Sequence, residues 1–191
     1  VDLTSENDLR IWYCLLNQGY QMPAVSSDYL TATDFDNSWM FLPLKETSTL
    51  IEKFNAIKKG AATMSNGPSL LFRIDDVLPG SFLIADNKNH QFVIQARVDP
   101  NTADIVESFE IIRNGVLYKK IKPESINNIF QIQFYHVFEQ SYAWYVVRTR
   151  TKLGKSAITN PIYFLPVGYL PPSPAATLLK ITIKDEKENV L

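Results

Sequence analysis

The chain has 191 residues, 46% of them hydrophobic and 20% charged, which is typical of a soluble globular protein. Its 19 basic and 20 acidic residues give a net charge of −1, so no overall field attracts nucleic acid or an anionic membrane. The longest apolar runs, such as residues 142–147, are too short to cross a bilayer, and residues 1–20 lack the order of a signal peptide. The sequence therefore predicts no nucleic-acid partner and no membrane span, and it leaves cytoplasm or bacterial export open.

The residues that most often bind metals or form disulfides are scarce. Cys14 is the sole cysteine, so the chain can form neither an internal disulfide nor a cysteine metal cluster. It lies in an amphipathic pattern, which favours a buried small hydrophobe over a reactive thiol. His90 and His136 are too few for a histidine-rich metal centre.

The N-terminal part is predicted to be mixed helix and strand. Residues 5–18 fit a helix that Ser5 or Asn7 caps and Gly19 ends, and its apolar positions recur at helical spacing: Leu9, Trp12, Tyr13 and Leu16. Residues 29–38 read as a polar loop, and residues 39–44 as a short buried strand.

A second helix is predicted over residues 47–59. Thr47 or Ser48 would cap it, and Lys58-Lys59-Gly60 would end it. Its apolar face comprises Leu50, Ile51, Phe54 and Ile57.

After Gly60 the pattern changes to the period of two that is typical of strands. We expect a turn at Pro79-Gly80 and a hairpin at Asn114-Gly115. In residues 90–98 we expect Phe92, Ile94, Ala96 and Val98 to point inward. Strands are predicted over residues 69–75, 90–98, 108–113, 116–121, 129–137, 142–149 and 157–165. About seven strands at this spacing indicate a β-sandwich, followed by a proline-rich linker, one more strand at 178–183 and a charged run at 184–188.

Three carboxylates in the N-terminal part are candidate metal ligands. Asp28 lies between a strand end and a loop, a place where oxygen ligands can converge on a cation. A serine-rich turn capped by Asp28 is the commoner arrangement for such residues. Asp34 and Asp36 could clasp a hard cation, but they lack the glycine and distal glutamate of a calcium loop, which favours a solvated loop.

Aromatic residues in the strand at 142–149 suggest a platform for carbohydrate. Tyr142 and Trp144 would share one face of this strand, and Tyr145 would point the other way. Aromatic residues of sandwiches belong to the core more often than to ligand platforms. Both alternatives stay open from the sequence.

An ordered set of motifs lies between residues 7 and 166. It comprises Trp12-Tyr13-Cys14-Leu15-Leu16-Asn17-Gln18-Gly19-Tyr20 followed by Pro23, Ser27-Asp28, the aromatic strand at 39–44, the helix end Lys58-Lys59-Gly60, Ser65-Asn66-Gly67-Pro68, Arg113-Asn114-Gly115 and Ala157-Ile158-Thr159-Asn160-Pro161-Ile162-Tyr163. Their order resembles the C-terminal part of PHP-superfamily metal-dependent hydrolases of the carbaryl-hydrolase-like (CehA/McbA-like) branch. The resemblance implies a distorted (β/α) barrel that binds divalent metals such as Zn, Mn or Fe and hydrolyses phosphoesters or other esters. It also implies an immunoglobulin-like sandwich after the barrel.

The resemblance transfers one metal ligand to this chain. Asp28 matches the late aspartate ligand of the family, whereas the H-x-H motif is absent, Leu30 stands where many members have histidine, and Ser27 or Ser26 stands where they have glycine. One carboxylate holds a metal weakly, since metal sites use three or more protein ligands. We therefore expect no tightly bound metal and no catalysis by this chain alone, and Asp28 would act only with the rest of the barrel.

The sequence thus predicts an α+β, mainly β protein. Residues 1–62 would be the C-terminal remnant of a PHP-like α/β domain, 63–166 an immunoglobulin-like β-sandwich, and 167–191 a linker with a C-terminal strand or tail. The expected partner is the missing N-terminal PHP portion or another copy of the chain. The alternative function is a stand-alone carbohydrate- or protein-binding sandwich that uses Trp144 and Tyr142.

Overall fold

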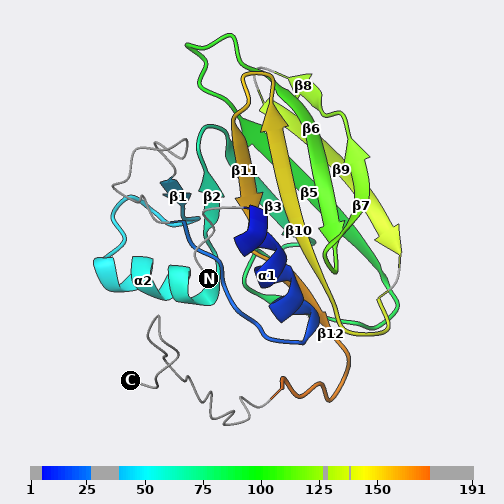
Figure 1. Ribbon diagram of the computed structural model, residues 1–191. Helices are drawn as coiled ribbons and strands as arrows, with labels where there is room; N and C mark the ends of the chain where they lie inside the picture. Colours follow the sequence, from blue (N-terminus) through cyan, green and yellow to red (C-terminus); the bar gives the residue numbers. More distant parts are fainter. Residues whose placement is uncertain (1–5, 27–38, 127–128, 138, 173–191) are drawn as a thin grey trace, which may run out of the picture.

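The protein is mainly β (Figure 1). The computed structural model describes residues 6–26, 39–126, 129–137 and 139–172. These residues form two helices and twelve strands. The expected cap at Ser5, the loop at 29–38, the strand at 178–183 and the charged run at 184–188 lie outside the described residues.

The larger sheet is built around β10, its central strand. β6 pairs antiparallel with one edge of β10. The other edge of β10 pairs with β11 along one part of its length and with β12 along another. β1 pairs with β2, so the N-terminal part contributes a strand to this sheet. Its strands are β1 (Trp39–Phe41), β2 (Thr63–Ser65), β4 (Phe82–Ile84), β6 (Val106–Arg113), β7 (Val116–Ile121), β10 (Ala143–Thr151), β11 (Ser156–Thr159) and β12 (Ile162–Leu165).

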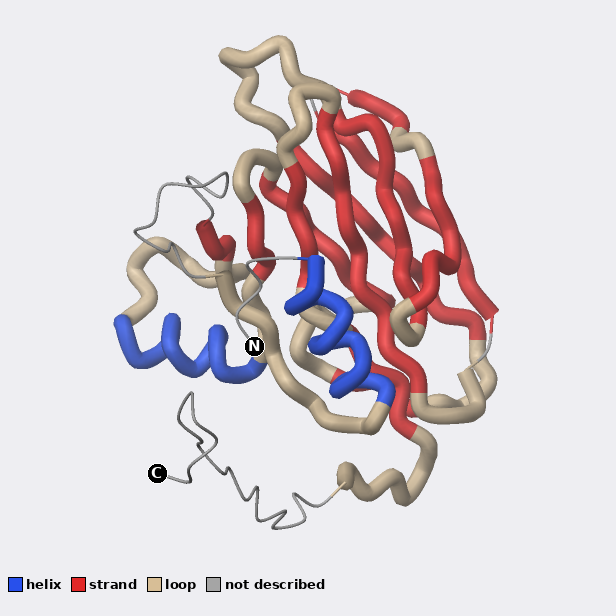
Figure 2. The backbone as a smooth tube through the Cα atoms, in the orientation of Figure 1, coloured by secondary structure: helices blue, strands red, loops and turns tan. Residues whose placement is uncertain are grey.

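The smaller sheet lies behind the larger one, and the two face each other as in a β-sandwich (Figure 2). It has the order β3 (Ser69–Ile74), β5 (Asn89–Arg97), β9 (Ile129–Val137) and β8 (Glu124–Ile126), with all neighbours antiparallel. Phe92, Ile94 and Ala96 of β5 are buried, which confirms the predicted alternation. They pack with Phe109, Tyr145 and other inward residues of the larger sheet to form the main core.

Helix α1 (Glu6–Asn17) covers the outer face of the larger sheet and makes a third layer. Trp12 and Leu16 are fully buried in a second hydrophobic cluster with residues of β2, β6, β10 and β12. Gly19 has φ +89°, and its N–H donates to the Leu16 carbonyl, so it ends the helix as predicted. The expected burial of Cys14 is wrong, because this residue points away from the sheet and is exposed.

The N-cap of helix α2 (Leu50–Lys59) lies one residue after Ser48, the later of the two predicted caps. Thr49 is the N-cap, because its hydroxyl accepts from the Glu52 N–H while the Glu52 carboxylate accepts from the Thr49 N–H. This reciprocal pair gives hydrogen-bond partners to two backbone N–H groups at the start of the helix, so Thr49 is the cap in place of Thr47 or Ser48. Gly60 has φ +80° and ends the helix as predicted.

The apolar face of α2 is exposed rather than packed on the sheets. Leu50 is 68% exposed, Ile51 73% and Phe54 62%. Ala56 is the buried residue of the helix. The helix therefore contacts the rest of the chain through the small side chain of Ala56, and its large apolar side chains point toward solvent.

The C-terminal end of α2 rests directly on the turn between β3 and β4. A Cβ atom at Gly80 would lie 2.0 Å from the Lys59 carbonyl oxygen, so only glycine permits this contact. Gly80 also has φ +82°, as the predicted Pro79-Gly80 turn requires. Its N–H donates to the Pro161 carbonyl at 2.7 Å, which links this turn to the larger sheet.

The strand predicted over residues 157–165 is interrupted in the structure. β11 and β12 pair with the same edge of β10, but the register shifts across Asn160 and Pro161. Proline has no N–H to donate to a strand ladder, and the Asn160 side chain turns to other partners. The Asn114-Gly115 hairpin is confirmed, with φ +51° and +81° between β6 and β7.

Asn160 is completely buried and connects three segments. Its Oδ1 accepts from the Ala24 N–H at 2.7 Å, and its Nδ2 donates to the carbonyls of Ala24 (3.0 Å) and Ala62 (2.9 Å). The side chain thus fixes the segment after α1 and the segment before β2 against the β11–β12 interruption.

Replacing Asn160 with alanine is expected to lower the free energy of unfolding by about 2–3 kcal/mol, because buried backbone groups lose their partners. Urea denaturation followed by tryptophan fluorescence measures the change. Asn101→Ala is the matched control, because Asn101 is exposed and bonds only within its own turn. An equal loss in both variants would contradict the role of Asn160.

Candidate functional site

The structure leaves the predicted metal ligand untested. Asp28, and with it Asp34 and Asp36, lies outside the described residues. Among the residues that the structure describes, no group of three or more His, Cys, Asp and Glu side chains could hold a metal ion.

His90 belongs to a small charged cluster at one end of the sandwich. Its Nδ1 lies 2.8 Å from Asp75 Oδ2, and the Asp75 Oδ1 accepts from the Gln91 N–H at 2.9 Å. Its Nε2 lies 3.7 Å from Asp86 Oδ1 and has no hydrogen-bond partner within the described part of the chain. Asp75 adopts φ +51° to make these contacts. The cluster fastens the turn after β3 to the start of β5.

A second charged cluster is buried where the chain enters β10. The Arg113 guanidinium donates to both carboxylate oxygens of Glu139, at 2.6 and 2.7 Å. Glu139 is 2% exposed and also accepts from the Tyr145 hydroxyl. The hydrogen bond to Glu139 raises the pKa of Arg113, and burial raises the pKa of Tyr145. The Glu139 carboxylate therefore accepts hydrogen bonds from a guanidinium on one side and a phenol hydroxyl on the other, which is a structural arrangement.

Trp144 is part of the cluster beneath α1. It is fully buried, its ring lies 5.1 Å from that of Tyr13, and its Nε1–H donates to Asn17 Oδ1 at 2.9 Å. Its indole has no free face for a sugar, so the structure favours the core alternative and corrects the platform hypothesis for this residue.

Tyr142 is half-buried at the lower end of the same cluster. Its hydroxyl donates to the Leu16 carbonyl at 2.9 Å, and its ring stacks on that of Tyr169 with 5.1 Å between the ring centroids. Burial raises the pKa of Tyr142. Both the ring and the hydroxyl are therefore engaged within the chain. Tyr142 and Trp144 thus belong to the same cluster, but they pack within the chain, Trp144 against α1 and Tyr142 against Tyr169.

The asparagines of four motifs form hydrogen bonds between separate elements. Asn114 Oδ1 accepts from the Trp144 N–H, and Asn17 Nδ2 donates to the Asn114 carbonyl. Asn66 Oδ1 accepts from the Ser156 N–H at 2.7 Å, which fixes the start of β11. Asn160 binds Ala24 and Ala62 as described above. The Asn17 and Asn160 bonds therefore join the N-terminal part to the sandwich, whereas the Asn66 bond and the side-chain bond of Asn114 join elements within the sandwich.

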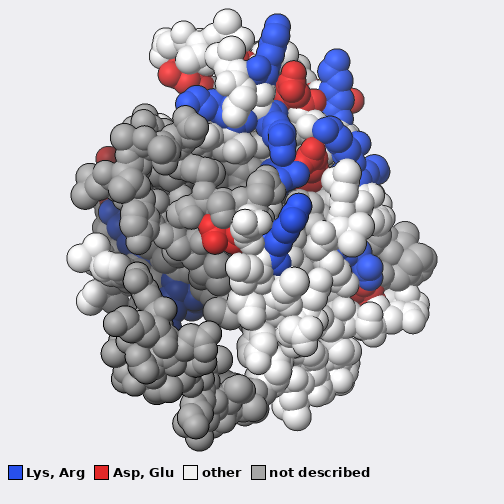
Figure 3. Space-filling view, in the orientation of Figure 1, with Lys and Arg blue, Asp and Glu red and all other residues white. Residues whose placement is uncertain are grey.

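Basic residues gather on the larger sheet beside α1, a feature that the sequence analysis missed. Figure 3 shows Lys and Arg side chains over the upper part of this face, above α1. Arg148, Arg150 and Lys152 follow one another at alternate positions along β10 and its turn, so one face of the strand carries them. This period of two was visible in the sequence and could have predicted the patch.

Glu110 lies within this basic face and is almost buried. Arg148 donates to its Oε2 at 2.8 Å, and Lys120 donates to its Oε1 at 3.0 Å. Burial disfavours the carboxylate, but the hydrogen bonds from Lys120 and Arg148 outweigh this effect and lower the pKa of Glu110. Glu110 therefore holds the Arg148 side chain in a fixed position on the face.

Comparison with known proteins does not extend these observations. A scan against models of known protein families found no match, and a search of curated proteins found none either. The helices of the described ranges are all too short or too polar to cross a membrane.

Proposed function

We propose that this chain is the C-terminal part of a PHP-like metal-dependent esterase or phosphoesterase, and that it has no turnover by itself. Residues 1–62 are the end of the barrel in this proposal. The following strands are an immunoglobulin-like sandwich that acts as a structural and interaction module. A Zn, Mn or Fe ion would be bound by the complete barrel, with Asp28 as one ligand.

The observation that carries the proposal is the bonding of the motif asparagines between elements. Asn17, Asn66, Asn114 and Asn160 come from four of the motifs on which the resemblance rests. Each one bonds to a residue of another element. Asn17 and Asn160 bond across the boundary between residues 1–62 and the sandwich, and Asn66 and Asn114 bond between elements of the sandwich. This arrangement supports the interpretation of residues 1–62 and the sandwich as one evolved unit.

The exposed face of α2 supports the expected partner. Leu50, Ile51 and Phe54 form a contiguous apolar surface on adjacent helical positions. Trp39 of β1, in the same N-terminal part, is 47% exposed. Contiguous exposed apolar residues on a soluble protein mark a contact surface. In our proposal this surface packs against the preceding part of the barrel.

The test compares this chain with a longer protein in which the upstream barrel is present. Both are assayed for bound metal by elemental analysis and for hydrolysis of p-nitrophenyl phosphate and p-nitrophenyl acetate. We expect metal and turnover in the longer protein, both lost on Asp28→Ala, and neither in the chain alone. Asn101→Ala serves as the neutral control, because Asn101 lies in an exposed turn.

Two results would contradict the proposal. The first is strong turnover by the 191-residue chain that disappears on Asp28→Ala, since the chain would then be an enzyme by itself. The second is a longer protein that binds metal and is active with Asp28→Ala, since Asp28 would then have no role at the site.

A further inference from the structure

Two adjoining hollows lie on the outer face of the larger sheet. The upper hollow, of about 440 Å³, is lined by Arg148, Arg150, Lys152, Glu107 and Ser156 among others. The lower hollow, of about 240 Å³, lies between α1 and the β6–β7 hairpin. Arg148 lines both. We call the two hollows together the basic groove.

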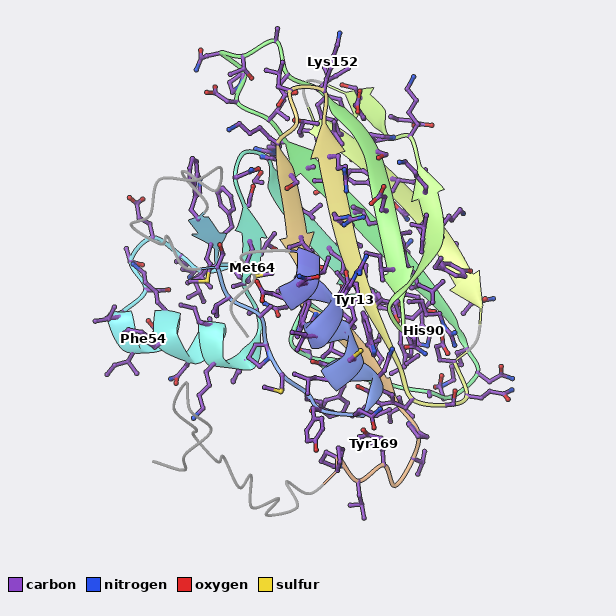
Figure 4. The ribbon with its side chains drawn as sticks, viewed as in Figure 1. Tyr13, Phe54, Met64, His90, Lys152 and Tyr169 are labelled. Carbon is purple, nitrogen blue, oxygen red and sulfur yellow. The ribbon has the colours of Figure 1, made fainter. Side chains whose placement is uncertain are left out.

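Positive charge dominates the basic groove. Its lining includes four basic residues, Arg10, Arg148, Arg150 and Lys152, against two acidic ones, Glu107 and Glu110. Lys120 further offsets Glu110 from outside the groove. Arg150 and Lys152 are exposed, and neither forms an ion pair with any residue in the described ranges. Figure 4 shows Lys152 at the end of the β10–β11 hairpin. Two cations are therefore available to a ligand.

The lower hollow differs in chemistry from the upper one. Leu9, Tyr13, Ile112 and Leu117 contribute apolar surface there. Leu117 is 53% exposed, so part of this surface faces solvent. A ligand that fills both hollows needs acidic groups at one end and an apolar group at the other.

We propose that the basic groove binds an extended acidic peptide segment of a partner protein, with an apolar side chain in the lower hollow and carboxylates on Arg150 and Lys152. Charge complementarity carries this assignment, because a net positive groove attracts acidic segments and repels basic ones. The Arg150 guanidinium can hold a carboxylate through two parallel hydrogen bonds. The inference is independent of the hydrolase proposal.

Other polyanions fit the groove less well. Single-stranded nucleic acid binds through exposed aromatic rings that stack on bases, and the aromatic residue of this lining, Tyr13, packs against Trp12 and Trp144. Acidic polysaccharides lack an apolar side chain for the lower hollow. The helices that bind anionic membranes carry a continuous apolar face along with their basic residues, whereas Arg150 belongs to a strand and Lys152 to the turn that follows it.

The test measures binding of a short fluorescein-labelled peptide, one leucine followed by alternating aspartate and glutamate, by fluorescence anisotropy. We expect saturable binding at low salt that weakens at high salt. The double variant Arg150→Glu/Lys152→Glu is expected to weaken binding about tenfold or more, because it reverses the charge that attracts the peptide. Leu117→Ser is expected to weaken the same peptide but not one whose leucine is replaced by serine.

Lys45→Glu/Lys53→Glu is the matched control, because it makes the same charge change at exposed residues in and before α2. Equal weakening by both double variants, or no weakening by Arg150→Glu/Lys152→Glu, overturns the proposal. The proposal is also overturned if an oligothymidylate, a heparin oligosaccharide or phosphatidylserine vesicles bind more tightly than the peptide and Arg150→Glu/Lys152→Glu abolishes that binding. Circular dichroism of each variant confirms folding, and failure of the double variant to fold shifts the test to Arg150→Gln.

Discussion

Replacement of Glu139 by alanine is expected to lower the free energy of unfolding by about 3–5 kcal/mol, the cost of breaking a buried ion pair from one side. The Arg113 guanidinium would lose both oxygens of the Glu139 carboxylate, and the buried Tyr145 hydroxyl would lose its acceptor. Arg113 is 36% exposed in its side chain and can recover some hydration, which places the loss near the lower end of this range. Urea denaturation, with the midpoint and slope fitted together, measures the change.

Two further variants distinguish the network from a general effect of removing an acid. Glu139→Gln keeps an acceptor for Tyr145 but loses the charge, so its loss should fall between wild type and Glu139→Ala. Glu107→Ala removes an exposed acid of the neighbouring strand and should change stability by less than about 0.5 kcal/mol. If Glu139→Ala is as mild as Glu107→Ala, the network does not stabilise the fold.

Trp144→Ala is expected to cost about 3–5 kcal/mol, because it leaves a large cavity in the packed cluster between α1 and the sheet. The cavity would remove the ring contact with Tyr13 and the hydrogen bond to Asn17. We expect α1 to detach before the sandwich unfolds, since this cluster joins the two. Amide hydrogen exchange should therefore show early loss of protection in residues 6–17.

Tyr135→Ala is the control for Trp144→Ala. Tyr135 is also an aromatic residue on a strand, but it is 69% exposed. It should change stability by about 0.5 kcal/mol or less. Trp144→Phe retains a ring and loses the indole N–H, so a loss of about 1 kcal/mol is expected. Unchanged stability in Trp144→Ala would show that the indole is not part of the core.

Local signals in the sequence predicted the parts of the fold that depend on short-range chemistry. The turn at Asn114-Gly115 and the helix end at Gly60 need positive φ angles, and these residues adopt them. The period of two in β5 predicted which side chains face the core. In each case the residue type and its immediate neighbours decide the conformation.

Features that depend on distant partners could not be predicted in this way. Strands β2, β4 and β8 have three residues each and exist because longer strands pair with them. The periodicity of α2 correctly predicted an apolar face, but periodicity does not show whether the chain contains a surface to cover it. The burial of Trp144 likewise depends on α1, which packs on β10 from far away in the sequence. The candidate metal ligand Asp28 stays a prediction.

The contact of Gly80 with the end of α2 fixes the direction in which this helix leaves the sandwich. A Cβ atom at position 80 would lie 2.0 Å from the Lys59 carbonyl oxygen, so the absence of a side chain at Gly80 lets the end of the helix lie directly against this turn. A partner that binds Leu50, Ile51 and Phe54 would therefore meet a helix that is already oriented, and association would need little free energy for ordering. A larger residue at position 80 should slow and weaken association even though it leaves every contact residue in place.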